Sequence, residues 1–374
     1  MKAEWSQKNR CSCLGEMTVD TFLSDYWQKK PLLVRNAFPD LKSPQGFPLS
    51  AEELAGLACE DNVNSRLVIN NKQPSTPEQA VWQLEFGPFD ESRFARLPEK
   101  DWSLLVSDVE RHLPESRFLL HPFRFIPDWR VDDLMISYAP PGGSVGAHTD
   151  AYDVFLIQLS GQRLWQISEN FPDETIANID LSILKDFTSE REWTLEAGDM
   201  LYLPPNVAHL GTACDYRDED DNEIQCLTAS VGFRAPSVKT LTSEFIHFCL
   251  ESTMDDDRYC DDSPAIPAHH AEISEATVDR FQTYIRKSLN FDREQVRQWL
   301  GQFSSDNKNF EDLVSIGSDH ETINYQKISE LVSDNTLMQS PYSNFLFSHT
   351  PVSYTHLRAH ETKEEIAYAV FCLK

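Results

Sequence analysis

The chain has 374 residues, of which 40% are hydrophobic and 25% charged, so it is neither low-complexity nor collagen-like, and its length favours two or three domains. No apolar run approaches the roughly 18 residues of a membrane-spanning helix, the N-terminus has no apolar signal core, and scattered cysteines without a CxxC pair are typical of a cytoplasmic protein. Acidic residues outnumber basic ones by 60 to 33, giving a net charge of −27. This charge disfavours free nucleic acid as a partner and favours basic proteins, although an acidic surface also serves solubility alone. Because no apolar run is long enough to cross a bilayer, we expect no membrane partner.

The first half of the chain changes from helical to β-rich patterns. Residues 17–39 predict a short helix and then a buried strand, PLLVRNA. Ser50 and Glu53 form a capping-box pattern at the start of a predicted helix over Ser50–Cys59. Apolar residues at helical spacing predict another helix over Trp102–Leu113. Short β-rich segments separated by glycine and proline turns follow from Asp133, so we expect a β core over roughly 30–235.

The second half turns helical after Ala235-Pro236. Apolar residues three and four apart predict helices over Ser243–Glu251, Glu272–Ser288 and Glu294–Phe303. The segment Gln326–Val332 and the residues after it have the pattern of a small helix-plus-strand domain.

The last residues, 352–374, differ in character from the rest. The eleven residues Val352–Thr362 read as the translation of a common transposase sequencing adapter, and Ile366–Leu373 nearly match its translated end, with one mismatch at Ala367. We therefore expect 352–374 to be a read-through artefact at the end of a truncated gene. For the same reason, we do not interpret His356 and His360, which are four residues apart in this tail, as a pair of metal ligands.

Two segments of the β-rich region carry metal-binding chemistry. His148 and Asp150 follow a glycine-rich turn, and residues two apart in extended chain point the same way. In the segment EAGDMLYLPPNVAHLG, a predicted strand is followed by a loop with two prolines, which places His209 at the mouth of the barrel. Two histidines and one carboxylate form a facial triad that holds Fe(II) and leaves positions open for a cosubstrate and dioxygen. The alternative is that these histidines only end strands.

Three further residues are candidates for binding 2-oxoglutarate. Arg163 lies on the strand after Asp150, and an arginine inside a barrel needs an anion, which the 5-carboxylate of 2-oxoglutarate would supply. Ser137 and Ser230 are candidate hydroxyl donors to the same cosubstrate. The alternatives are an exposed arginine and ordinary strand serines.

These motifs resemble the JmjC-type Fe(II)/2-oxoglutarate oxygenases, and more narrowly the bacterial ribosomal oxygenases that hydroxylate an arginine of a large-subunit ribosomal protein. The likeness covers most of residues 17–303 and rests on DWRVDDLMIS, GGSVGAHTDAYDVFLIQ, GDMLYLPPNVAH and SVGFRAPS. In this family, His148, Asp150 and His209 match the iron ligands, and Arg163 and Ser137 match positions that bind 2-oxoglutarate. The acidic insertion 215–223 departs from the pattern and could reshape the substrate mouth.

The resemblance implies a fold and a domain order. We expect a double-stranded β-helix core over 1–236, a helical dimerisation region over 237–303, and a truncated winged-helix-like segment over 304–351. It also implies a cytoplasmic, homodimeric dioxygenase acting on a basic ribosomal protein. The alternatives are a related oxygenase acting on a histidine side chain, and a cupin-like module that binds metal without turnover. A buried Arg163 would distinguish an oxygenase from the metal-binding module, because a simple metal-binding cupin has no need of a buried arginine beside its metal.

Overall fold

The computed structural model describes residues 11–43, 46–70, 82–177, 179–251, 258–260, 266, 269–289, 291–305, 337–339, 346–348, 352–354 and 371–373. The chain divides into two compact units, Met1–Ala235 and Pro236–Lys374. Among the described residues, no helix is both long enough and apolar enough to span a bilayer.

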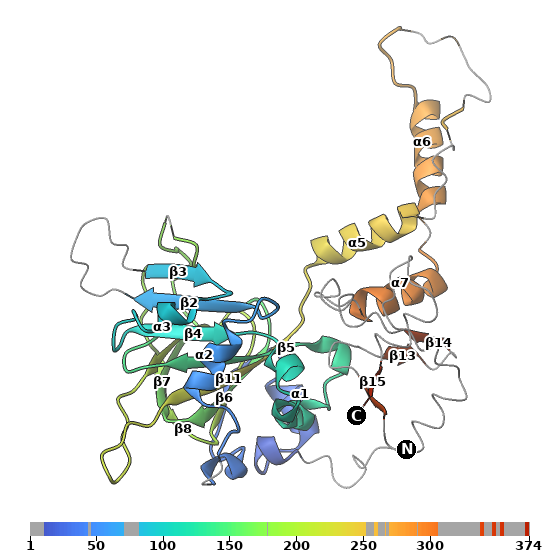
Figure 1. The fold of residues 1–374 in the computed structure, drawn as a ribbon. Coiled ribbons are helices and arrows are strands. Elements are labelled where there is room, and N and C mark those ends of the chain that lie inside the picture. The colour runs from blue at the N-terminus through green and yellow to red at the C-terminus, as the bar shows by residue number, and fades with distance from the viewer. Residues whose placement is uncertain are drawn as a thin grey trace. The chain divides into compact units, whose positions relative to one another are not determined.

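The first unit is built on two antiparallel sheets (Figure 1). The larger has eight strands in the order β1-β9-β6-β11-β5-β4-β2-β3, and the smaller has three in the order β10-β7-β8. The strands are β1 Leu32–Val34, β2 Ser65–Asn70, β3 Trp82–Phe86, β4 Trp102–Val106, β5 Val131–Ala139, β6 Val154–Ser160, β7 Gln162–Ser168, β8 Arg191–Glu196, β9 Met200–Leu203, β10 Ala208–Ala213 and β11 Cys226–Phe233. The helices of this unit are α1 Val19–Asp25, α2 Ala51–Leu57, α3 Glu91–Phe94 and α4 Val109–His112.

The inner faces of the two sheets pack against each other. Val154 and Leu156 of β6 share an apolar cluster with Trp165 of β7 and Leu195 of β8. The outer face of the large sheet packs on the N-terminal region instead, where Phe155 contacts Phe22 of α1. Strand β6 is therefore buried on both faces, which explains its continuous apolar run Val154–Ile157. This is the double-stranded β-helix that the resemblance implies, built on the predicted β core.

Two helix predictions in this unit have different outcomes. Helix α2 begins after Ser50, whose side chain and that of Glu53 make the complete capping box. The helix expected over Trp102–Leu113 is wrong, because Trp102–Val106 is strand β4 and only Val109–His112 is helical. All five residues of β4 are buried between β2 and β5. A strand buried on both faces loses its alternation, so its apolar spacing resembles that of a helix.

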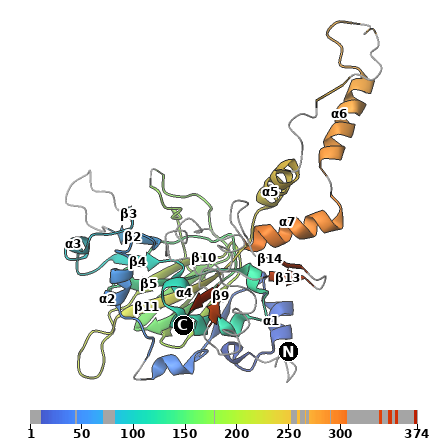
Figure 2. The same cartoon turned by 45° about the vertical axis from the view of Figure 1, so that its right-hand side comes forward.

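The second unit contains the three predicted helices, which are α5 Val238–Glu251, α6 Glu275–Ser288 and α7 Arg293–Ser305 (Figure 2). Phe245 of α5 packs edge-on against Trp299 of α7 in a small apolar cluster. Short strands follow in two pairs, in which β12 Leu337–Gln339 pairs with β15 Phe371–Leu373, and β13 Leu346–Ser348 pairs with β14 Val352–Tyr354. The expected helix Gln326–Val332 lies outside the described residues, as does most of the 304–351 segment.

Candidate active site

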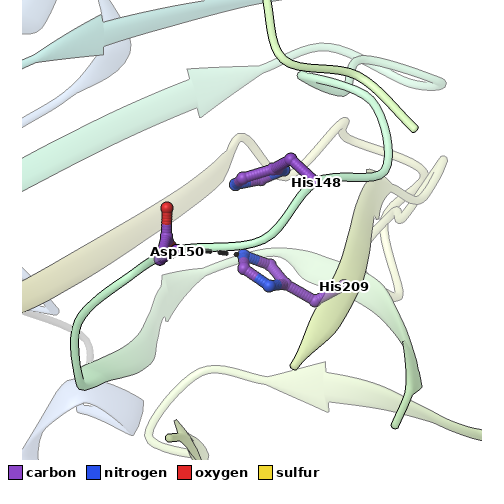
Figure 3. A group of neighbouring side chains, drawn as sticks. All are labelled: His148, Asp150 and His209. Atoms are coloured by element: carbon purple, nitrogen blue, oxygen red, sulfur yellow. Dashed lines mark ion pairs between the residues drawn. The ribbon is translucent and has the colours of Figure 1, made fainter. Parts of the chain in front are cut away.

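Three side chains from two segments converge at one end of the β-helix (Figure 3). His148 and Asp150 lie in the connection between β5 and β6, and His209 is the second residue of β10. One potential ligand atom of each lies within 4.8 Å of the others. The His209 Nε2 is 3.6 Å from the Asp150 Oδ2. Two imidazoles and one carboxylate in this arrangement suit a divalent transition metal bound on one face.

Backbone carbonyls orient both imidazoles. The His148 Nδ1 lies 3.0 Å from the Gly146 carbonyl oxygen, and the His209 Nδ1 lies 3.0 Å from the Val207 carbonyl oxygen. A carbonyl oxygen can only accept, so each Nδ1 carries the proton and each Nε2 keeps its lone pair for a metal. Gly146 has a φ of +84°, and a Cβ there would come within 2.9 Å of Ile183, so this turn requires glycine.

Burial keeps His209 in the form that binds metal. Its side chain is 3% exposed, and burial, with a contribution from His148, lowers the pKa of His209 to about 4. The imidazole is therefore neutral near pH 7, as a metal ligand must be.

Arg163 is buried on β7 without complete hydrogen bonding. It is 4% exposed, and its Nε and Nη2 have no hydrogen-bond partner among the residues that the structure describes. Its cross-strand partner on β10 is Ala213, which clusters with Ala139 of β5. Ser137 lies two residues before Ala139 and so points to the same face. The two sheets thus meet near Arg163 and Ser137, at the end of β10 away from His209.

The two candidate serines lie on neighbouring strands of the large sheet. Ser137 of β5 is buried opposite Thr228 of β11 and donates a long 3.4 Å hydrogen bond to its carbonyl oxygen. The Thr228 hydroxyl donates to Gln158 at 3.1 Å. Ser230 is half-buried opposite Met135, one step further along the same face. Ser137 is therefore placed deeper in the fold than Ser230.

Sequence reasoning missed a group of side chains close to Asp150. Tyr152 follows Asp150 by two residues, and a Cβ on Gly232 would lie 3.7 Å from its ring and 3.4 Å from an Asp133 carboxylate oxygen. Burial, with the nearby carboxylates of Asp150, Asp133 and Asp132, raises the pKa of Tyr152. These residues belong to DWRVDDLMIS and HTDAYDVF, whose acidic and aromatic content was the available signal.

The acidic insertion 215–223 lies elsewhere. It follows Ala213, the last residue of β10, whereas His209 is near the start of that strand. Four residues of strand span about 13 Å. The insertion therefore begins at the end of β10 that lies beside Arg163. The strand direction does not support the expectation that it reshapes a substrate mouth near His209.

Comparisons with known proteins agree with this geometry. A JmjC domain family matches residues 118–241. The Escherichia coli ribosomal protein uL16 3-hydroxylase is 36% identical over 78% of this chain and 73% of its own length. A probable ribosomal oxygenase of Haemophilus influenzae is 40% identical over 61% of this chain, a match that spans about half (53%) of that relative.

Solved structures extend the likeness over nearly the whole chain. The crystal structure of E. coli YcfD superposes with a TM-score of 0.75 and 30% identity, covering 96% of this chain and 91% of that one. Another structure of the E. coli ribosomal oxygenase YcfD, in complex with cobalt and 2-oxoglutarate, has a TM-score of 0.71 and 31% identity, covering 91% of this chain and 84% of that one. The chain therefore belongs to the JmjC-type bacterial ribosomal oxygenases, a family of Fe(II)- and 2-oxoglutarate-dependent dioxygenases.

Proposed function

We propose that this protein hydroxylates an arginine side chain of a large-subunit ribosomal protein, with Fe(II) held by His148, Asp150 and His209 and with 2-oxoglutarate and dioxygen as cosubstrates. The donor set fits the metal, because both Nε2 lone pairs and the carboxylate converge. When bound, the iron supplies open coordination positions and the redox chemistry that couples decarboxylation of 2-oxoglutarate to C–H hydroxylation.

The observation that carries the proposal is the buried, incompletely bonded guanidinium of Arg163. A buried cation requires an anionic partner, and Nε with Nη2 forms the edge that binds a carboxylate through two hydrogen bonds. Ser137, near the same end, would donate its hydroxyl to that carboxylate in place of its long bond to Thr228. Ser230, one step further along the same face, would be a second hydroxyl donor to the cosubstrate. With its 2-oxo acid end at the metal ligands, 2-oxoglutarate would extend its distal carboxylate toward Arg163.

The aromatic and acidic side chains close to Asp150 favour a cationic side chain as substrate. A guanidinium would stack on the exposed part of the Tyr152 ring while Asp133 accepts its hydrogen bonds. The E. coli relative is named for its action on uL16. The net charge of −27 would attract such a basic protein and repel free nucleic acid. A ribosomal substrate also places the enzyme in the cytoplasm.

Helix α6 supports the homodimer. None of its residues is buried. Three apolar residues spaced three and four apart share one face of the helix and are largely exposed: Val278 at 48%, Phe281 at 51% and Ile285 at 57%. An amphipathic helix whose apolar face is exposed in one chain is stabilised by covering that face, and we propose a second copy of this chain as the cover. Light scattering should give a dimer mass, and a Phe281→Glu, Ile285→Glu variant should give a monomer.

The function is tested by incubating the protein with Fe(II), 2-oxoglutarate, oxygen and uL16, and locating the added oxygen by tandem mass spectrometry. We expect one oxygen on an arginine, with succinate formed in proportion. Oxygen on a histidine would support the related histidine oxygenase instead. Arg163→Gln should raise the KM for 2-oxoglutarate at least about thirtyfold while metal binding persists, whereas the matched variant Arg191→Gln, at an exposed position, should not.

A further inference from the structure

A second buried donor lies beside Arg163. Trp165 is 5% exposed, and its Nε1 has no hydrogen-bond partner among the residues described. Buried indole N–H groups usually find an acceptor, so an unpartnered one needs an explanation. Arg163 and Trp165 are two residues apart on β7 and share a face, and the Arg163 Cζ lies 5.8 Å from the indole centroid. The strand therefore presents unpaired donors from two consecutive inward positions.

Trp165 occupies the middle of the path between the metal ligands and Arg163. On β10, His209 pairs with Ile167, Gly211 with Trp165, and Ala213 with Arg163. Directly opposite residues of an antiparallel pair point to the same face. The Trp165 ring is 5.9 Å from the His209 ring, centroid to centroid. A ligand that reaches from the metal to Arg163 must pass beside this indole.

Gly211 fixes how the indole lies. A Cβ at Gly211 would come within 2.7 Å of the Trp165 Cη2 and Cζ3 atoms and 3.0 Å of Cε3. The edge of the six-membered ring therefore lies over Gly211. Nε1 is on the opposite edge of the indole and so is turned away from β10.

We propose that the Trp165 Nε1–H donates a hydrogen bond to the distal carboxylate of 2-oxoglutarate, the same carboxylate that Arg163 binds. This rests on the proposed function and adds a cosubstrate-binding residue to it. Arg163 supplies the charge and two donors, and Trp165 supplies a third donor with a fixed direction. A carboxylate can accept all three, because its two oxygens offer about four acceptor positions.

The test separates hydrogen bonding from packing by comparing two ligands. 2-Oxopentanoate has the same chain length as 2-oxoglutarate but ends in a methyl group. Dissociation constants for both are measured by titration calorimetry on the Mn(II)-loaded protein, for wild type and Trp165→Phe. The matched control is Trp193→Phe, the half-buried partner of Trp165 on β8.

Trp165→Phe should weaken 2-oxoglutarate binding about tenfold, as expected for a hydrogen bond to a charged group, with little change for 2-oxopentanoate. Trp193→Phe should change neither. Equal weakening of both ligands, or an unchanged constant for 2-oxoglutarate, would overturn the inference. If Trp165→Phe does not fold, benzothienylalanine at position 165 keeps the ring shape and replaces only the N–H, and the same outcomes apply.

Failure of the inference can be told from failure of the proposed function. A wild-type protein that prefers 2-oxoglutarate, with a Trp165→Phe variant that keeps the whole preference, removes Trp165 alone. A wild-type protein that binds 2-oxoglutarate no better than 2-oxopentanoate contradicts the cosubstrate itself, and both proposals fall.

Discussion

The backbones of His148 and His209 are hydrogen-bonded to each other. The His148 N–H donates to the His209 carbonyl oxygen at 3.0 Å, and the His209 N–H donates to the His148 carbonyl oxygen at 2.9 Å. Strand β10 is therefore fixed by β7 on one side and by the His148 segment on the other. These two bonds use only main-chain atoms, so the two histidines stay in register even when an imidazole is removed.

Replacing a ligand should therefore remove metal affinity and leave the fold. We expect His209→Ala to bind Mn(II) or Co(II) more than about a hundredfold more weakly, since losing an outer-shell partner already costs 10- to 100-fold. Calorimetry measures this, and circular dichroism checks the fold. The control is His247→Ala, whose side chain is exposed on α5. Undiminished affinity in His209→Ala would exclude His209 as a ligand.

Gly211→Ala should weaken the binding of 2-oxoglutarate more than the binding of the metal. The new Cβ would collide with the Trp165 ring, which is enclosed in the apolar cluster between the sheets and has little room to move. We expect a loss of about 1–3 kcal/mol in the free energy of unfolding, together with weaker 2-oxoglutarate binding and retained Mn(II) binding. Gly56→Ala, where nothing lies within 4 Å of the new Cβ, is the control. A variant with wild-type stability would mean that the indole can shift freely.

The turns and short apolar segments predict a β core, because these signals are local, and the resemblance to the JmjC-type oxygenases adds that this core is a double-stranded β-helix. The sequence also suggests the three candidate metal ligands, because H-x-D and the later His209 each lie where a loop meets a predicted strand. The sequence does not predict β4, because this strand lies between β2 and β5 with all five residues buried and so shows no alternation of apolar and polar residues. Only the folded structure shows that both faces of Trp102–Val106 are covered.

Trp165 illustrates a second limit. Its place in an alternating strand indicates burial, and the structure confirms it at 5% exposure. Whether a buried indole packs or donates depends on which groups surround its N–H, and those groups come from other strands. In the same way, Tyr152 and Asp133 are far apart in the sequence, and they meet beside Gly232 because β11 pairs with both β5 and β6.

Glu110 should make stability depend on pH. It lies on α4, where its carboxylate accepts the Leu134 N–H at 3.1 Å. Burial, and then Asp108, raises the pKa of Glu110 to about 7, although Arg111 opposes the change. The unfolded chain releases this proton near pH 4.5, so the stabilisation is complete below that pH and is lost as the pH rises through about 7.

The matched variant is Glu110→Gln, which keeps an acceptor for Leu134 without titrating. Between pH 5 and pH 8, we expect its unfolding free energy to improve relative to wild type by on the order of 1–3 kcal/mol, measured by urea denaturation. Glu60→Gln, at an exposed position, should show no such trend. Parallel pH curves for wild type and Glu110→Gln would show that Glu110 does not titrate in this range.

We propose that residues 352–374 are not part of the selected protein, and their deletion tests this. The structure pairs Val352–Tyr354 with β13 and Phe371–Leu373 with β12. If these short pairings were never selected, deleting 352–374 should change Tm by less than about 2 °C. Deleting 293–374 is the control, because it also removes α7 and the Trp299 packing on Phe245 and should destabilise the second unit. A clear fall in Tm on the shorter deletion would mean that the tail packs as real structure.

Charge at the site mouth should govern how fast a basic substrate arrives. Exposed charges are screened beyond about 8 Å at physiological ionic strength, and steered association falls steeply with salt. We expect kcat/KM on a basic ribosomal protein to drop several-fold between low salt and about 0.3 M salt. The kcat should change less, because bound substrate no longer depends on long-range attraction.

Two sets of acidic residues can be compared as the source of this attraction. Asp132 and Asp133 lie near Tyr152, whereas the four acids at 218–221 follow the far end of β10, about 13 Å along the strand from His209. Asp218 also shapes its own loop, since its carboxylate accepts hydrogen bonds from the backbone N–H groups of Asp220 and Asn222. Neutralising Asp132 and Asp133 should therefore flatten the salt dependence of kcat/KM more than neutralising all four acids at 218–221, with Asp218→Asn alone as the control for loop disruption. The opposite order would make the insertion the steering element, and a wild-type rate independent of salt would remove the electrostatic argument for a basic protein substrate.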